Sequence, residues 1–186
     1  MLSFTRYTIR AEALVPWVKF IWSLEDGDAN VDYKLLPTDC IDLILCLSGK
    51  IIYETDSNRI TAPPLHMNGL HDRHCHILQT GAVHVFGISF YSFGLFPFVN
   101  KSLEHIQNRI VDSHDLSIQL AQKLEAAVSD ITGDTTALIE KALCSGLRTT
   151  YDCRRKSNLI RDYLETTISA GAFCGERGVN TKHLKE

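Results

Sequence analysis

The residues whose types and spacing could hold a metal ion are gathered in one segment. Five of the eight histidines and one cysteine fall within nineteen residues: His66, His71, His74, Cys75, His76 and His84. If this segment is a strand, His74 and His76 point to one face and Cys75 points to the other. A third histidine or a carboxylate from a surrounding barrel would complete a catalytic metal site with an open position. The segment therefore raises the hypothesis of a bound metal.

The neighbouring residues weaken this hypothesis. Metal-dependent cupin enzymes typically place a glutamate a few residues after such histidines, whereas the run from Cys75 to His84 offers Gln79 and no carboxylate. We therefore favour surface or loop histidines and predict no metal. The sequence also lacks a G-x-S-x-G elbow, a phosphate-binding glycine loop and a C-x-x-C pair. We predict no catalytic residues, no cofactor and no enzymatic activity.

Size and charge narrow the class of protein further. A chain of 186 residues with 45% hydrophobic residues can bury one principal core and carry a helical extension. The net charge is -3 and the pI about 6.2, so most of the chain lacks the basic footprint of a nucleic-acid-binding domain. Most of the chain is therefore expected to do something other than contact DNA.

The N-terminus and the cysteines indicate a cytoplasmic protein. Arg6, Arg10 and Glu12 interrupt the first apolar residues, so no signal peptide is predicted, and no membrane span is expected. We expect the six cysteines to be free thiols, mostly buried as small apolar residues. They are Cys40, Cys46, Cys75, Cys144, Cys153 and Cys174.

Short runs typical of β-strands extend from about Val31 to Phe98. Residues 40–47 and 51–53 flank Ser48-Gly49-Lys50, which predicts a tight hairpin. A second pair is predicted from residues 74–78 and 83–90, which flank Thr80-Gly81. Ala62-Pro63-Pro64 indicates a loop or a sheet edge. Together these runs favour an antiparallel sandwich or small barrel.

Helical periodicity replaces this pattern after about Lys101. Ser117 is a plausible N-cap for a helix with the apolar stripe Ile118, Leu120, Ala121, Leu124, Ala127 and Val128. A second helix carries Leu138, Ile139, Ala142 and Leu143, and a third runs from about Lys156 to Thr167. The expected fold class is α+β, with a β-rich half followed by helices.

The end of the chain has the spacing of a helix-turn-helix. Cys174 is the small residue where two helices cross, and Gly178, four residues later, makes the turn with positive φ. Phe173, Val179 and Leu184 occupy the apolar positions, and Asn180 can cap the second helix. Residues that would face DNA in the complete protein are Thr181, Lys182, His183 and Lys185. An ordinary helical hairpin with a glycine C-cap explains the same spacing equally well.

Ordered blocks along the whole chain resemble the AraC/XylS family of transcription regulators. LVPWVKFIWSLE, LLPTDCIDLILCLSG and FGISFYSFGLFPF are similar to three blocks of a cupin-like sensor domain found in these regulators. HIQNRIVD is similar to the segment that closes that domain, and GVNTKHLKE resembles the start of the first recognition helix. Ser92 and Thr38 depart from the proline and aspartate usual in these blocks, and Cys174 from the usual alanine.

The resemblance implies a division into three parts. Residues 1–112 would form a cupin-like effector domain, residues 113–155 a helical linker and dimerisation region, and residues 156–186 the start of the DNA-binding domain. Because such a DNA-binding domain has about 100 residues, the chain is expected to be a truncated fragment. The implied partners are an unidentified small-molecule effector, a second copy of the chain and, for the full-length protein alone, DNA.

Two local features keep more than one interpretation. Trp17 and Trp22 could stack on an effector, although core packing is the favoured interpretation. Asp39 and Asp42 are expected to hydrogen-bond loop backbone groups rather than to act in catalysis. The effector-binding residues are not predicted. The alternatives to a regulator are a small cupin-like metal-binding protein or enzyme, and an interaction domain that only dimerises.

Overall fold

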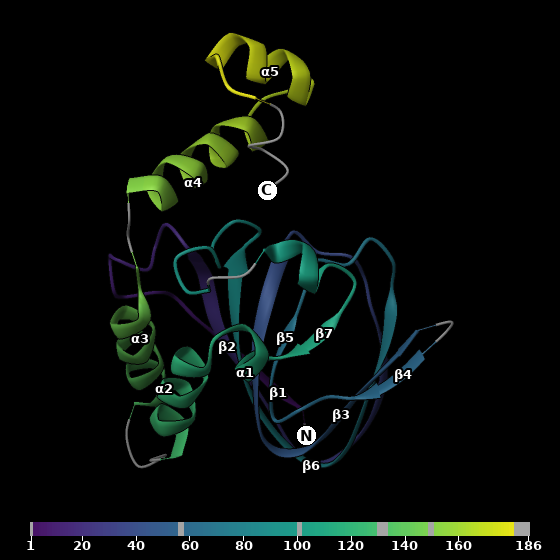
Figure 1. Cartoon of the computed structure of the whole chain (residues 1–186). Coiled ribbons are helices and arrows are strands. Elements are labelled where there is room, and N and C mark those ends of the chain that lie inside the picture. The colour runs from purple at the N-terminus through teal and green to yellow at the C-terminus, as the bar shows by residue number, and fades with distance from the viewer. Residues whose placement is uncertain (1, 56–57, 100–101, 130–133, 149–150, 181–186) are drawn as a thin grey trace.

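The structure is a computed structural model that describes residues 2–55, 58–99, 102–129, 134–148 and 151–180. Strands come first and α-helices follow, as Figure 1 shows. The strands are β1 (Ser3–Tyr7), β2 (Val18–Leu35), β3 (Cys40–Thr55), β4 (Asn58–Thr61), β5 (Leu65–Asn68), β6 (Cys75–Tyr91) and β7 (Ile110–Asp112). The helices are η1 (Leu103–Ile106), α1 (Ser113–Leu116), α2 (Ile118–Ser129), α3 (Thr135–Gly146), α4 (Tyr151–Leu164) and α5 (Ala170–Arg177). The predicted α+β class, with an antiparallel β-rich half followed by helices, is confirmed.

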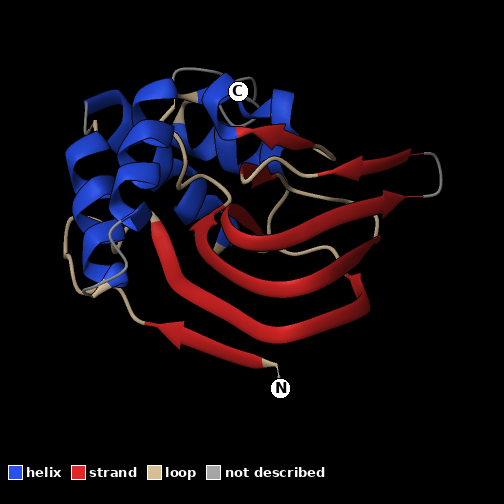
Figure 2. Ribbon diagram, turned by 90° about the horizontal axis from the view of Figure 1, so that it is seen from below, coloured by secondary structure: helices blue, strands red, loops and turns tan. Residues whose placement is uncertain are grey.

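Three long strands form the centre of one antiparallel sheet. The strand order is β1-β2-β6-β3-β5-β7, and β4 pairs with β3. Strand β6 pairs with β2 on one side and with β3 on the other along nearly its whole length. Figure 2 shows how these strands curve together into a trough.

The curvature comes from irregularities that lie side by side in the three strands. The register shifts in β2 between Asp26 and Ala29, and in β3 between Cys46 and Lys50. Gly49 and Gly81 have φ of 84° and 85°, a conformation open to glycine at little cost. A bulge at these positions bends each strand and increases its twist. The three strands therefore bend at the same place along their length, and the sheet folds over itself there.

Both predicted hairpins are wrong for this reason. Gly49 lies within the continuous strand β3 and Gly81 within the continuous strand β6. A glycine with positive φ is the signal of a tight turn and also of a bulge, and here it bends a strand without reversing it. The predicted loop at residues 62–64 is confirmed, since it separates β4 from β5.

The two faces of the sheet bury different sets of residues. One face, which we call the helix face, carries Ile41, Leu43 and Leu45 of β3 into the core beneath α2 and α3. The opposite face, which we call the inner face, carries Ile44, Ile51 and other residues into a second cluster inside the trough. Because side chains alternate along a strand, each long strand contributes to both clusters.

Helices α2 and α3 follow the predicted periods, with one exception. Leu120, Leu124 and Val128 of α2 are buried, and the Ser117 hydroxyl accepts a hydrogen bond from the Leu120 N–H at 3.4 Å. Ile118 was placed in the same stripe, but its side chain is 60% exposed. This prediction is wrong because Ile118 begins the helix, where the chain has only just left α1.

The cysteine prediction holds only in part. Cys40, Cys46, Cys75, Cys144 and Cys174 are free thiols, and Cys153 lies among residues whose side chains the structure does not describe. Only Cys75 and Cys174 are buried, whereas Cys144 is exposed. The expectation that most are buried is therefore wrong for the part of the chain that the structure describes. No described helix is both long and apolar enough to cross a membrane.

Candidate functional site

A buried carboxyl group lies on the inner face beside an unusual aromatic contact. Trp22, Gly87 and Ile44 are register neighbours on adjacent strands, and the Trp22 indole lies against Gly87. The indole N–H and the Ser89 hydroxyl both donate hydrogen bonds to Asp42. Burial raises the pKa of Asp42, and these two hydrogen bonds oppose the rise. Asp42 therefore hydrogen-bonds side chains within the sheet, not loop backbone groups as predicted.

A buried histidine of β5, His66, lies near the Asp42 carboxyl group. The Nδ1 of His66 lies 2.7 Å from the carbonyl oxygen of Pro63, which can only accept, so Nδ1 carries the proton. The Tyr53 hydroxyl, 2.9 Å from Nε2, then donates to His66. Burial lowers the pKa of His66 to about 4. His66 is therefore a neutral member of the buried network.

Two tyrosines extend the polar part of the inner face. Burial raises the pKa of Tyr53 well above its ordinary value, and partial burial raises that of Tyr33, which stays 38% exposed, to about 12. The charges that Asp42 and Cys75 carry when ionised add to both effects. Tyr33 and Tyr53 both pair in register with Ile77, two residues along β6 from Cys75. Perturbed groups gathered inside a fold are candidates for a functional site.

Next to these groups lies a cavity of about 430 Å³, within the range usual for small-molecule sites. It is lined by Leu2, Phe4, Trp22, Leu24, Val31, Tyr33 and Gln79. Residues of β2 from both sides of its bend line the cavity, so the cavity exists because the sheet folds over. Strand β1 pairs with β2 from Ile21 to Glu25, and Phe4 packs on Trp22 with ring centroids 5.9 Å apart.

The polar residue in this lining lacks a partner. Gln79 lies between Val31 and Ile51 in register and is 3% exposed. Its Oε1 is buried and accepts no hydrogen bond from any described residue. A buried acceptor without a partner costs free energy, and in native proteins it calls for an explanation. We take the cavity and the polar groups beside it as the candidate functional site.

The structure separates most of the histidines that raised the metal hypothesis, although the ring centroids of His74 and His76 lie 6.1 Å apart. His76 is exposed on one face of β6 and Cys75 is buried on the other, as strand alternation predicts, whereas His74, also exposed, directly precedes the strand. His71 lies 2.7 Å from Asn68, His76 lies 3.1 Å from Asp32 and His84 lies 3.2 Å from Glu25. In the described residues no three histidine, cysteine or acidic side chains are close enough together to hold a metal. His66, expected at the surface or in a loop, is instead fully buried in a strand.

The two tryptophans and Asp39 have distinct environments. Trp17 is 4% exposed and packs in the main core, as favoured from the sequence. Trp22 is half-buried and lines the cavity, so the stacking alternative stays open for this residue. Asp39 forms an ion pair with Lys19 at 2.7 Å, and its carboxylate also accepts a hydrogen bond from its own backbone N–H in the loop before β3, so this prediction is confirmed for Asp39.

The residues of the predicted helix-turn-helix lie partly within the structure. Phe173 and Cys174 are buried between α4 and α5, and Phe173 packs on Tyr163 with centroids 5.4 Å apart. Gly178 has a φ of 62°, and its N–H and that of Val179 bond to carbonyls near the end of α5. A helical hairpin and a helix-turn-helix share this geometry, so the function of these residues stays a prediction. Thr181, Lys182, His183, Leu184 and Lys185 lie outside the described residues.

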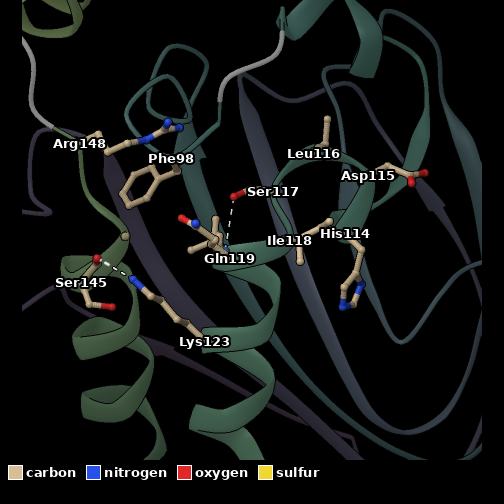
Figure 3. A pocket seen from close by; sticks show the side chains of 12 residues that line it. Phe98, His114, Asp115, Leu116, Ser117, Ile118, Gln119, Lys123, Ser145 and Arg148 are labelled. Atoms are coloured by element: carbon tan, nitrogen blue, oxygen red, sulfur yellow. Dashed lines mark hydrogen bonds between the residues drawn. The ribbon is translucent and has the colours of Figure 1, made fainter.

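A second cavity, of about 410 Å³, lies where α1, α2 and the end of α3 meet (Figure 3). The Nζ of Lys123 donates to the carbonyl oxygen of Ser145 at 2.7 Å, so this cation already satisfies the end of α3. Most of the other labelled side chains lie at helix ends. Helix residues line most of this cavity. Among the described residues that line it, none has a buried side-chain polar atom without a hydrogen-bond partner.

The connection between β1 and β2 is held by two helices. Glu140 of α3 is buried and accepts hydrogen bonds from the backbone N–H groups of Arg10 and Ala11, at 3.2 and 2.8 Å. Arg161 of α4 donates to the carbonyl oxygen of Pro16 at 3.4 Å, and its guanidinium lies over the Phe93 ring. The connection between the strands that line the cavity is thus in direct contact with both α3 and α4.

Replacing Glu140 by alanine tests the first of these contacts. The variant leaves two backbone donors without their acceptor, so we expect the free energy of unfolding to fall by about 2 kcal/mol. Urea denaturation followed by circular dichroism measures the change. Glu165→Ala removes an equally charged but exposed side chain and should change stability by less than about 0.5 kcal/mol. Equal stability of the two variants would show that the contact is not formed in solution.

Trp22, named from the sequence as a residue that could stack on an effector, lines the cavity, but the other lining residues were not predicted. Phe4 precedes the predicted β region. Gln79 was noted only because it lies where a metal-dependent cupin enzyme would have a glutamate. One signal was present, because Cys75, Ile77 and Gln79 alternate on one face of a strand whose intervening positions include the polar residues His76 and Thr80 beside Leu78. A glutamine at an inward position of such a strand indicates a buried amide.

Comparisons with solved structures give low similarity. The EutQ protein of Clostridium difficile matches with 10% identity and a TM-score of 0.37, over 49% of this chain and 68% of that chain. The AraC-like transcriptional activator CuxR matches with 13% identity and a TM-score of 0.42, over 99% and 87%. The Cupin_2 domain of an XRE family transcriptional regulator from Enterobacter cloacae matches with 13% identity and a TM-score of 0.33, over 48% and 96%. At these values the similarities carry no function over to this chain.

A comparison with curated proteins gives no match. A family profile, in contrast, matches residues 10–112, which include most of the sheet and the whole connection between Arg10 and Trp17. Because this match covers more than half of the sequence, the chain belongs to the family described as a domain of unknown function, DUF6597.

Proposed function

We propose that this chain is the regulatory part of an AraC-type transcription regulator, in which a small effector bound on the inner face changes the arrangement of the helices. One observation carries the proposal. Strands β1 and β2 wall the cavity, and the connection between them is held by Glu140 of α3 and Arg161 of α4. A molecule that moves β1 or Trp22 therefore acts on the same segment that the helices contact.

The energetic requirement for such regulation is strict. An effector shifts an equilibrium only by the difference between its affinities for two arrangements. In the proposed mechanism, the two arrangements differ in how residues 8–17 contact α3 and α4. A dimer is part of the proposal, because the dimer sets the spacing of two DNA half-sites. We propose that α2 and α3 form the dimer interface.

We propose a non-catalytic role. Asp42 and His66, the most perturbed acid and base of the inner face, are hydrogen-bonded to neighbouring side chains and to the Pro63 carbonyl. Neither lines the cavity beside Gln79. These contacts support a structural role for both groups.

DNA selection tests the proposal. The chain is expressed together with any further residues that its gene encodes, and this longer chain is incubated with a random-sequence DNA library. We expect the longer chain to enrich a defined sequence, and its affinity to fall at least tenfold between 50 and 200 mM salt, because basic residues would displace counterions from phosphate. Residues 1–186 alone serve as the control and are expected to enrich no sequence. If the longer chain selects no sequence at any salt concentration, the regulator proposal is wrong.

A further inference from the structure

The cavity beside Gln79 has the features of a site for one class of small molecule. We propose that it binds a neutral, largely apolar molecule carrying a single hydrogen-bond donor, which pairs with Oε1 of Gln79. This inference rests on the proposed function, because it names the chemistry of the effector.

The apolar part of the inference follows from the lining. Five of the seven lining residues are apolar, and the other two, Tyr33 and Gln79, are uncharged. A charged group placed here would lose its hydration without gaining an ionic partner from the lining, which is costly. The Trp22 and Phe4 rings offer faces on which a flat apolar molecule can stack.

The donor follows from the unpartnered amide. Gln79 lies in the lining, and its Oε1 is buried without a hydrogen bond from any residue that the structure describes. The last side-chain torsion of glutamine is broad, so the amide can turn toward a molecule in the cavity. A ligand N–H or O–H would supply the missing bond, whereas an acceptor would leave Oε1 unpaired.

The access route follows from the strand pairing. In the described residues, β1 covers the outer edge of β2 only from Ile21 to Glu25, whereas Tyr33 lies beyond that stretch. Leu2, Phe4 and Tyr33, at 49%, 59% and 38% exposure, line the cavity and reach solvent. A molecule can therefore enter between β1 and the second half of β2 without unfolding the sheet.

Indole and benzofuran test the inference, because they share one shape and differ in that benzofuran has an ether oxygen where indole has its N–H donor. Titration calorimetry with residues 1–186 is expected to show indole binding about tenfold more tightly than benzofuran. In Gln79→Met the two affinities should become equal, through loss of indole affinity alone. Retained benzofuran binding then shows that the variant is folded. Gln122→Met, on the exposed face of α2, is the matched control and should keep the tenfold preference.

Phe4→Ala should weaken both probes, whereas Leu36→Ala, an exposed apolar residue outside the lining, should weaken neither. Equal affinity of wild type for indole and benzofuran would overturn the donor assignment without any variant being needed. Binding of neither probe would overturn the site. A dimer in sedimentation that Phe4→Ala dissociates would assign the cavity to a second copy of the chain and overturn the proposal as well.

These outcomes are independent of the DNA experiment. The tenfold preference for indole in a protein whose longer chain selects no DNA would support the site and reject the regulator. DNA selection by a chain that binds indole and benzofuran equally would support the regulator and reject the assignment of a hydrogen-bond donor to the ligand.

Discussion

Gly87→Ala is expected to lower the free energy of unfolding by about 3 kcal/mol, because it combines a steric clash with the loss of a buried hydrogen bond. A Cβ at residue 87 would lie 1.9 Å from Cε2 of Trp22 and 2.5 Å from its Nε1. The indole would have to move away, and its N–H could no longer donate to Asp42. The same movement of the Trp22 ring changes the wall of the cavity, so the affinity of the protein for the free probe indole should fall at least tenfold.

Gly27→Ala is the matched control for this prediction. Gly27 lies in β2, and a Cβ at this position would meet no atom within 4 Å. We expect its stability to remain within about 1 kcal/mol of wild type. The double variant Gly87→Ala/Trp22→Val should lose less stability than the sum of the two single variants, because the smaller side chain leaves room for the new methyl group. Wild-type stability of Gly87→Ala would mean that Trp22 does not lie against Gly87 in solution.

Acidification is expected to destabilise the chain through His66. Burial lowers the pKa of His66 to about 4 in the folded chain, whereas the unfolded chain keeps the ordinary value of 6.5. Between these values the unfolded state binds a proton that the folded state does not, so stability falls as pH falls from about 6.5 to about 4. The loss is complete below the lower value and amounts to about 3 kcal/mol.

Comparison with His66→Gln isolates this contribution. Glutamine does not titrate, yet its amide can donate to the Pro63 carbonyl and accept from Tyr53. Urea denaturation at pH 7 and pH 4.5 should therefore show a smaller loss for the variant. Asp42 acts in the opposite direction, because its raised pKa makes stability fall as pH rises, but both proteins contain Asp42 and the comparison removes its effect. His74→Gln replaces an exposed histidine directly before β6, and this variant should lose as much stability as wild type. Identical pH dependence of wild type and His66→Gln would exclude a neutral buried His66.

The α+β class, the helical stripes of α2 and α3 and the glycine end of α5 could be predicted from the sequence, because each depends on residues a few positions apart. Leu120, Leu124 and Val128 recur at the helical period, and Gly178 has the conformation that follows from its place after a helix. Strand alternation likewise placed Cys75 on the face opposite His76. These features are local, and their physical causes act within one element.

Only the tertiary structure decided whether Gly49 and Gly81 turn the chain or bend it, because both outcomes use the same positive φ. The answer depends on β6 pairing with β2 and β3 on both sides of the bend. The histidines changed meaning for a related reason. Their sequence proximity suggested one cluster, but the folded sheet exposes His74 and His76 and buries His66 against Tyr53. The cavity brings together Phe4, Trp22, Val31 and Gln79, which are distant in sequence and meet because the sheet folds over itself. No local pattern encodes such a meeting.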